Sequence, residues 1–183
     1  PMALSLHYSA KNSVSFLQIL ALEMDVAQRV QGEISNACNS RKRYNGITVY
    51  TMEDGMVVSL HNNLLLASSS LHVLESSIRH LENNTSILDK REFENLLRRH
   101  GTVSGVYINH NQIGKLFSGM VERDFLGYSD YMMKFTQWSC MEIRKSAGRI
   151  SLSGVLDNGS DESRFSNILG SQSARKSFMG RIL

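Results

Sequence analysis

Three consecutive serines stand beside a histidine in the stretch LLLASSSLHVLESSIRHL, and this is where hydrolytic chemistry would be sought first. A nucleophilic serine needs a base within hydrogen-bond reach. The candidates for such a pair in and around the Ser68-Ser70 loop are Ser69, Ser70, His72 and His61. However, the chain has no G-x-S-x-G elbow and no S-x-x-K after these serines. A helix expected from Leu71 needs acceptors for its first N–H groups, and serine hydroxyls supply them. We therefore expect the serines to cap this helix, and a serine hydrolase is the alternative.

Basic residues gather at Arg41-Lys42-Arg43, Arg98-Arg99-His100 and Arg175-Lys176. We expect these clusters at the ends of helices, where cations offset the negative end of the helix dipole. A nucleic-acid surface would join such clusters and place aromatic side chains between them, but only Tyr44 adjoins one. We expect no nucleic-acid partner. The second alternative function is a weak nucleic-acid binder that uses Arg41, Lys42, Arg43, Arg98 and Arg99.

The acidic stretch DNGSDES offers Asp157, Asp161 and Glu162 as calcium ligands. A calcium loop needs six or more ordered oxygen ligands, and this stretch lacks that length and pattern. Asn158-Gly159 is a turn pair, and Asp161 or Ser163 suits the cap of a following helix. We expect a loop here and no metal.

Histidine, glycine and cysteine form no recognisable site. The six histidines show no zinc-binding spacing, and no glycine-rich phosphate loop occurs. Cys38 lies on the apolar side of a helix pattern and Cys140 lies in a strand pattern, so buried free thiols are favoured over a disulfide. Trp138 is expected to anchor a core. We expect no catalytic, cofactor-binding or metal-binding residues and no cofactor.

The elements of the first half follow from hydrophobic spacing. Alternation predicts a strand over residues 3–8. A long helix is predicted next, with Ser15 and Gln18 at capping-box spacing. Its apolar side consists of Leu17, Leu20, Met24, Ala27, Val30, Ile34 and Cys38. ITVYTM, MVVSLH and LLLAS then predict an antiparallel meander with turns at Asp54-Gly55 and Asn62-Asn63. A helix from Leu71 to Leu81 follows.

The second half alternates helices and strands. Asp89 and Glu92 have capping-box spacing for a helix that ends at Gly101. TVSGVYIN predicts a strand, and WSCMEIRK with RISLSGVL predicts a hairpin. One further helix is marked by Ile113, Leu116, Phe117, Met120 and Val121, and the last by Phe165, Ile168 and Leu169. The expected class is α+β, an antiparallel sheet of hairpins with helices packed mainly on one face.

The chain has 183 residues, 42% of them hydrophobic, and a net charge of +3. This suits a single domain over residues 1–183, with halves at 1–88 and 89–183. The chain opens on PMALSLHY and closes on KSFMGRIL, with no polar tail and no apolar run long enough to cross a bilayer. We expect a piece of a longer polypeptide.

Three segments resemble a known family: VVSLHNNLLLASSSLHVLESSIRHL, SGVYINHNQIGKLF and FTQWSCMEIRKSAGRISLSGVLDNG. They are similar to a strand–turn–strand–helix unit, a strand with an Asn-rich end, and a Trp-bearing hairpin of uncharacterised envelope proteins of Bacteroidetes bacteria. That family is called domain of unknown function 3352, and the resemblance covers residues 47–183.

The resemblance implies a membrane-anchored parent protein whose globular part lies in the periplasm or cell envelope, with the anchor outside this fragment. The family has no accepted activity, so no catalytic residue is carried over. Its pattern residues include Trp138, Gly154 and the ASSS junction, for which packing and capping suffice. We expect a non-catalytic binding or structural domain, whose partner is another envelope protein or the rest of its own chain.

Overall fold

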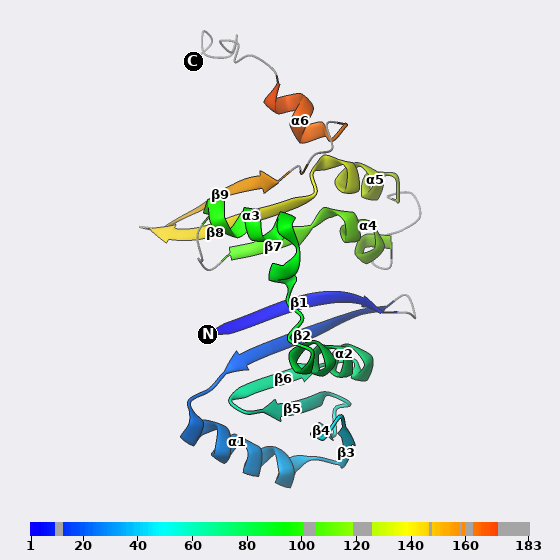
Figure 1. The fold of residues 1–183 in the computed structure, drawn as a ribbon, viewed down its shortest axis with the longest axis vertical. Coiled ribbons are helices and arrows are strands. Elements are labelled where there is room, and N and C mark those ends of the chain that lie inside the picture. Colours follow the sequence, from blue (N-terminus) through cyan, green and yellow to red (C-terminus); the bar gives the residue numbers. More distant parts are fainter. Residues whose placement is uncertain are drawn as a thin grey trace. The chain divides into compact units, whose positions relative to one another are not determined.

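In a computed structural model, residues 1–9, 13–100, 105–118, 126–146, 148–157, 159 and 163–171 are described. The chain divides into two compact units, Pro1–Ser86 and Ile87–Leu183. Each unit has its own antiparallel sheet with helices, so the predicted α+β class is confirmed (Figure 1). None of the described helices is both long and apolar enough to span a bilayer.

The first unit contains a six-stranded sheet in the order β1-β2-β6-β5-β4-β3, with every neighbouring pair antiparallel. Its strands are β1 (Met2–Ser9), β2 (Ser13–Ala21), β3 (Ser40–Tyr44), β4 (Ile47–Thr51), β5 (Val57–His61) and β6 (Leu64–Ser68). The predicted meander of β4, β5 and β6 is confirmed. Gly55 and Asn62 have positive φ angles of 82° and 54°, the backbone conformation that tight hairpin turns require.

The predicted long helix is wrong in its first half, because residues 13–21 form β2 and the helix α1 (Met24–Ala37) begins only afterwards. Ser15 and Gln18 therefore do not form a capping box; they pair with His7 and Leu4 of β1. Leu17 and Leu20 fit helical spacing, but β2 bonds along its length to β1 and, from Leu17 on, to β6. These long-range ladders outweigh the local helical pattern.

The cluster Arg41-Lys42-Arg43 also differs from its predicted position at a helix end. It lies in β3, which pairs with β4 and forms one edge of the sheet. The strand alternation separates the three cations: Lys42 lies on the face that carries Val49, whereas Arg41 and Arg43 pair with Tyr50 and Thr48 on the other.

The core of the first unit lies between the sheet and α2 (Leu71–Glu82), which occupies its predicted residues. Leu74 and Ile78, one turn apart on α2, are fully buried against the sheet. The buried cluster consists of Leu17, Val49, Val57, Leu66, Leu74 and Ile78.

The second unit contains a three-stranded antiparallel sheet in the order β7-β8-β9. Its elements are a 3-10 turn η1 (Ile87–Asp89), α3 (Arg91–His100), β7 (Gly105–Asn109), α4 (His110–Ser118), α5 (Leu126–Phe135), β8 (Trp138–Ser146), β9 (Arg149–Asp157) and α6 (Phe165–Gly170). The predicted hairpin is β8–β9, and the predicted last helix is α6. Helix α5 has no counterpart among the sequence predictions. Gly101, Met120 and Val121 lie outside the described residues.

Helix α3 begins two residues later than its predicted cap. The Lys90 carbonyl accepts the N–H of Glu94 at 3.0 Å, so Lys90, and not Asp89, occupies the capping position. One side of α3 packs Phe93 and Leu96 on the sheet, where they meet Trp138 and Cys140. Trp138 contacts Phe93 edge to face with 5.0 Å between ring centroids, which confirms it as a core anchor.

Both cysteines are free thiols, but only Cys140 is buried as predicted. Cys38 follows the last residue of α1 and is half-buried, and its thiol contacts the Ser35 carbonyl at 3.3 Å. The prediction of a buried Cys38 is therefore wrong.

Gly154 in β9 is required by close strand packing. A β-carbon at this position would overlap the carbonyl oxygen of Cys140 on β8, which is backbone and cannot rotate away. We therefore expect Gly154→Ala to lower the free energy of unfolding of the second unit by about 1–3 kcal/mol. Trp138 is the only tryptophan and lies in this unit, so urea unfolding followed by its fluorescence measures the effect.

Gly127→Ala is the matched control, because a β-carbon on Gly127 in α5 has no atom within 4 Å. It should leave the unfolding midpoint unchanged or raise it, since alanine favours helix by up to about 1 kcal/mol. Equal effects of the two substitutions would contradict the steric account.

Candidate functional site

The serine run lies at the corner where β6 leads into α2, and its hydroxyls bond to the neighbouring strand β2. Ser68 is fully buried; its hydroxyl donates to the Phe16 carbonyl at 2.6 Å and accepts the Ser70 N–H at 3.1 Å. The Ser69 hydroxyl accepts the Phe16 N–H at 3.3 Å. Two serines thus hold both polar main-chain groups of Phe16.

The serines lie at the start of α2 as predicted, but they do not cap the helix through their side chains. Ser70 directly precedes α2 and its carbonyl accepts the Leu74 N–H at 3.1 Å, yet its side chain makes no capping bond. His72 is exposed on α2 and His61 ends β5, and no hydrogen bond joins either of these described residues to the serines. The serine–histidine pairs that a hydrolase would need are not assembled.

Basic residues of the clusters form ion pairs with acidic residues of different helices and strands. Lys42 pairs with Glu75 of α2 at 2.6 Å, while Arg98 pairs with Glu94 and Arg99 with Asp157 in the second unit. Arg41 and Arg43 line a shallow hollow of about 280 Å³ with Lys42, Thr48 and Tyr50. Tyr50 is buried in the sheet, so its ring is not presented for base stacking.

The acidic stretch contributes no metal site within the described part of the chain. Asp157 is the last residue of β9, where it is buried and contacts Arg99 at 3.5 Å. Asp161, Glu162, Arg175 and Lys176 lie outside the described residues. Across the described ranges, no group of three or more His, Cys, Asp and Glu side chains is arranged to hold a metal ion.

The second unit holds a serine–histidine pair that the sequence did not reveal. His110, the first residue of α4, has its Nε2 atom 2.9 Å from the Ser139 hydroxyl on β8 and its Nδ1 atom 3.0 Å from the Met132 carbonyl. A carbonyl only accepts, so Nδ1 carries the proton, and in the neutral ring Nε2 accepts from Ser139. Desolvation lowers the pKa of His110, and the charge of Arg164 acts in the same direction, against the bond to Met132.

The hydrogen bond runs from the serine hydroxyl to the imidazole, as it does between a catalytic serine and its general base. Its surroundings differ from those of a catalytic serine, because both residues are buried: His110 is 6% exposed and Ser139 is 4% exposed. The position of a triad carboxylate is also taken by a main-chain carbonyl. The arrangement fastens α4 to α5 and β8.

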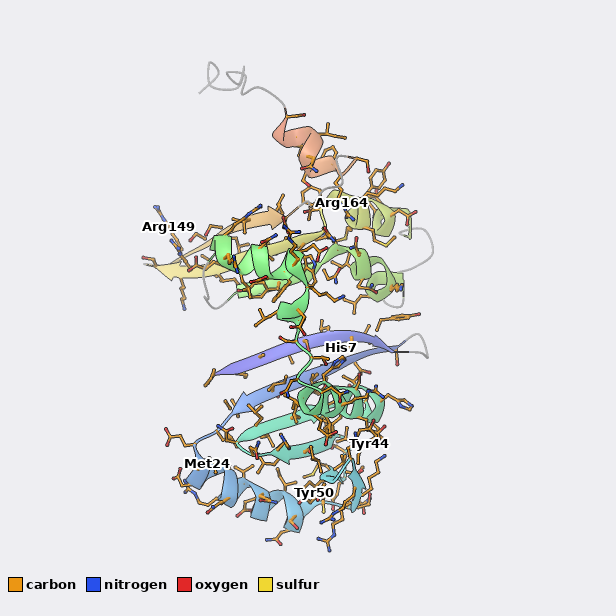
Figure 2. All side chains as sticks on the ribbon, viewed as in Figure 1. His7, Met24, Tyr44, Tyr50, Arg149 and Arg164 are labelled. Atoms are coloured by element: carbon orange, nitrogen blue, oxygen red, sulfur yellow. The ribbon has the colours of Figure 1, made fainter. Side chains whose placement is uncertain are left out.

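Arg164 and Ser166 complete the same network at the end of α5. The Arg164 guanidinium donates to the carbonyls of Met133 and Thr136 at 2.9 and 2.7 Å, and Ser166 donates to the Phe135 carbonyl at 2.7 Å. With the His110 bond to Met132, four carbonyls at the end of this helix receive side-chain donors. Figure 2 shows Arg164 beside α5. These donors satisfy groups that a helix end leaves open.

A second serine–histidine contact lies in β1, where the Ser5 hydroxyl is 2.8 Å from Nε2 of His7. The Ser5 hydroxyl donates to the Leu17 carbonyl at 3.4 Å, so the imidazole must donate to Ser5. This polarity is the reverse of general-base activation. Burial lowers the pKa of His7.

Sequence reasoning missed the network of His110, Ser139 and Arg164 because its members are far apart and α5 was not predicted. The only local signal was a histidine that directly follows the strand GVYIN. No family model, no curated protein and no solved structure matches this chain.

We expect Ser68→Ala to destabilise the first unit by about 1–3 kcal/mol, because Ser68 is fully buried and the Phe16 carbonyl loses its hydroxyl donor. Ser69→Ala, at an exposed position with a longer bond, should change stability by no more than about 0.5 kcal/mol. Hydrogen–deuterium exchange of peptides from β2 and β6 measures both. The reverse order of effects would refute the structural role of Ser68.

We expect the second unit to lose stability as the pH falls below 6.5, the ordinary pKa of histidine. The folded state holds His110 neutral while the unfolded state takes up a proton, so stability is full above pH 6.5 and declines below it. The slope is at most about 1.4 kcal/mol for each pH unit. Urea unfolding followed by Trp138 fluorescence at pH 7.5 and 5.5 measures the difference.

His110→Gln should be less stable at pH 7.5 and lose most of this slope. His72→Gln, at an exposed position, should retain it. An unchanged slope in His110→Gln would show that another group titrates.

Proposed function

We propose that this chain is a non-catalytic binding or structural module that recruits a protein segment along the edge strand β1. The observation that carries the proposal is the row Met2, Leu4 and Leu6 on one face of β1, with 66%, 64% and 58% of each side chain exposed. An exposed, apolar edge strand is a template on which another chain adds a strand.

The two edges of the six-stranded sheet differ in charge. β3 has the sequence SRKRY, and its cations discourage pairing with another strand. β1 has the sequence MALSLHYS and contains no lysine, arginine, acid or proline. The contrast supports β1 as the interacting edge and gives the basic cluster a role that needs no nucleic acid.

The other face of β1 carries polar side chains that bond within the sheet. Ser5 and His7 are half-buried and bonded to each other, while Ser5 also reaches Leu17 of β2. β1 is therefore tied to the sheet over all eight of its residues, which favours a preformed edge over a strand that must fold on binding.

The resemblance to envelope proteins supports the cell envelope or periplasm as the place of action, with another envelope protein or the rest of the parent chain as the partner. An enzymatic role has less support, because Ser68, Ser69 and His110 bond to main-chain groups.

Replacing Leu6 by the photo-crosslinking residue benzoylphenylalanine tests the proposal in cells that express the full open reading frame. We expect light to produce a heavier adduct, because Leu6 lies on the exposed apolar row. Electrophoresis and mass spectrometry identify the adduct. A second substitution, Leu4→Lys, should abolish it by placing a charge on the same face.

The matched control places the same crosslinker at Arg43 on the opposite edge strand, where we expect no adduct. An absence of adduct at Leu6, or equal adducts at both edges, would contradict the proposal. Stoichiometric labelling of Ser69 or Ser139 by a fluorophosphonate probe would instead establish a serine hydrolase.

A further inference from the structure

Within the described residues, the β8–β9 hairpin extends beyond the rest of its sheet. The first described residue of β7, Gly105, pairs with Glu142 of β8. Residues 143–146 of β8 and 149–152 of β9 pair with each other alone within the described residues, and we call this part the ribbon. Figure 1 shows β8 and β9 continuing past β7. Both faces of a two-stranded ribbon are open to surrounding molecules.

One face of the ribbon is apolar. Ile143 pairs with Leu152, and the next pair on this face is Lys145 with Ile150. The side chains of Ile143, Ile150 and Leu152 are 55%, 72% and 65% exposed. Along the same face of the sheet, Leu156 and Val106 are also exposed, so the apolar strip continues past the ribbon.

The end of the ribbon is cationic. Residues 143–152 contain Arg144, Lys145 and Arg149 and no acidic residue. Arg144 pairs with Glu142 at 2.7 Å, whereas neither Lys145 nor Arg149 has an acidic partner among the described residues. Figure 2 shows Arg149 at the free end of the hairpin. Exposed aliphatic side chains and cations thus meet within a few residues.

We propose that the ribbon docks onto an anionic phospholipid surface. Its aliphatic face would enter the boundary between headgroups and acyl chains, and its cations would contact lipid phosphates. Lys145 lies on the aliphatic face, and its long side chain keeps the ammonium group at headgroup level while its methylene groups stay in apolar surroundings. Basic residues attract the ribbon to the surface, and aliphatic burial holds it there.

Other occupants fit less well. A second copy that packed symmetrically on this face would bury Lys145, and residues 143–152 offer no acidic side chain to meet its charge. A nucleic acid would gain from stacking, but the described residues of the ribbon include no aromatic side chain. The inference goes beyond the proposed function, because the ribbon belongs to the second unit and does not involve β1.

Flotation with lipid vesicles tests the inference on the 183-residue chain. We expect the chain to float with vesicles of phosphatidylcholine and phosphatidylglycerol in equal parts, and not with phosphatidylcholine alone. Lys145→Glu with Arg149→Glu should lower the bound fraction at least about tenfold. Ile150→Ser with Leu152→Ser should also lower it, and the residual binding should disappear in high salt.

The matched control, Met24→Ser with Arg79→Glu, makes the same kinds of change at exposed positions of the first unit and should bind as the original chain does. Trp138 fluorescence verifies that each ribbon variant retains its fold. Absence of flotation, equal binding to both vesicles, or unchanged binding of the ribbon variants would overturn the inference. A dimer that Ile150→Ser with Leu152→Ser dissociates, without flotation, would assign the face to a second copy. Neither result affects crosslinking at Leu6.

Discussion

Buried main-chain groups must have hydrogen-bond partners, and in this protein polar side chains supply many of them. Ser68 and Ser69 hold the carbonyl and the N–H of Phe16 where β6 turns into α2. At the end of α5, His110 and Arg164, together with Ser166, bond to the last carbonyls of the helix. These bonds hold helices and strands of each unit together. They involve the same serine and histidine side chains that would be candidates for catalysis.

The contact between Ser139 and His110 shows why polarity alone does not identify a catalytic pair. The Met132 carbonyl fixes the proton on Nδ1, and Nε2 is then left as an acceptor, as in a serine hydrolase. A catalytic pair further needs a reactive hydroxyl that substrate can reach and donors for an oxyanion. Ser139 is buried between elements that the same bonds hold together. The direction of the hydrogen bond between Ser139 and His110 follows from the bond that His110 makes to a carbonyl at the end of α5.

Local patterns in the sequence predicted the meander, α2 and the β8–β9 hairpin, because turn residues such as Gly55 and Asn62 and apolar periodicity agree there. They failed for β2, where helical spacing of leucines competes with ladders to β1 and β6 that only the tertiary fold supplies. Helix α5 was missed because Tyr128 and Tyr131 are exposed and its apolar periodicity is weak. Without α5, the bonding of His110 and Arg164 had no sequence signal.

The two proposals concern exposed surfaces of the protein, and these surfaces differ in charge. β3 carries three cations on an edge that otherwise would pair with other strands, whereas β1 carries none and presents aliphatic side chains. The ribbon of β8–β9 combines both features, because Lys145 and Arg149 adjoin Ile150. An uncharged edge suits pairing with a peptide, while cations beside exposed aliphatic groups suit an anionic boundary between water and hydrocarbon. In the two proposals, cations therefore discourage association at β3 and favour it at the ribbon, according to whether exposed apolar side chains lie beside them.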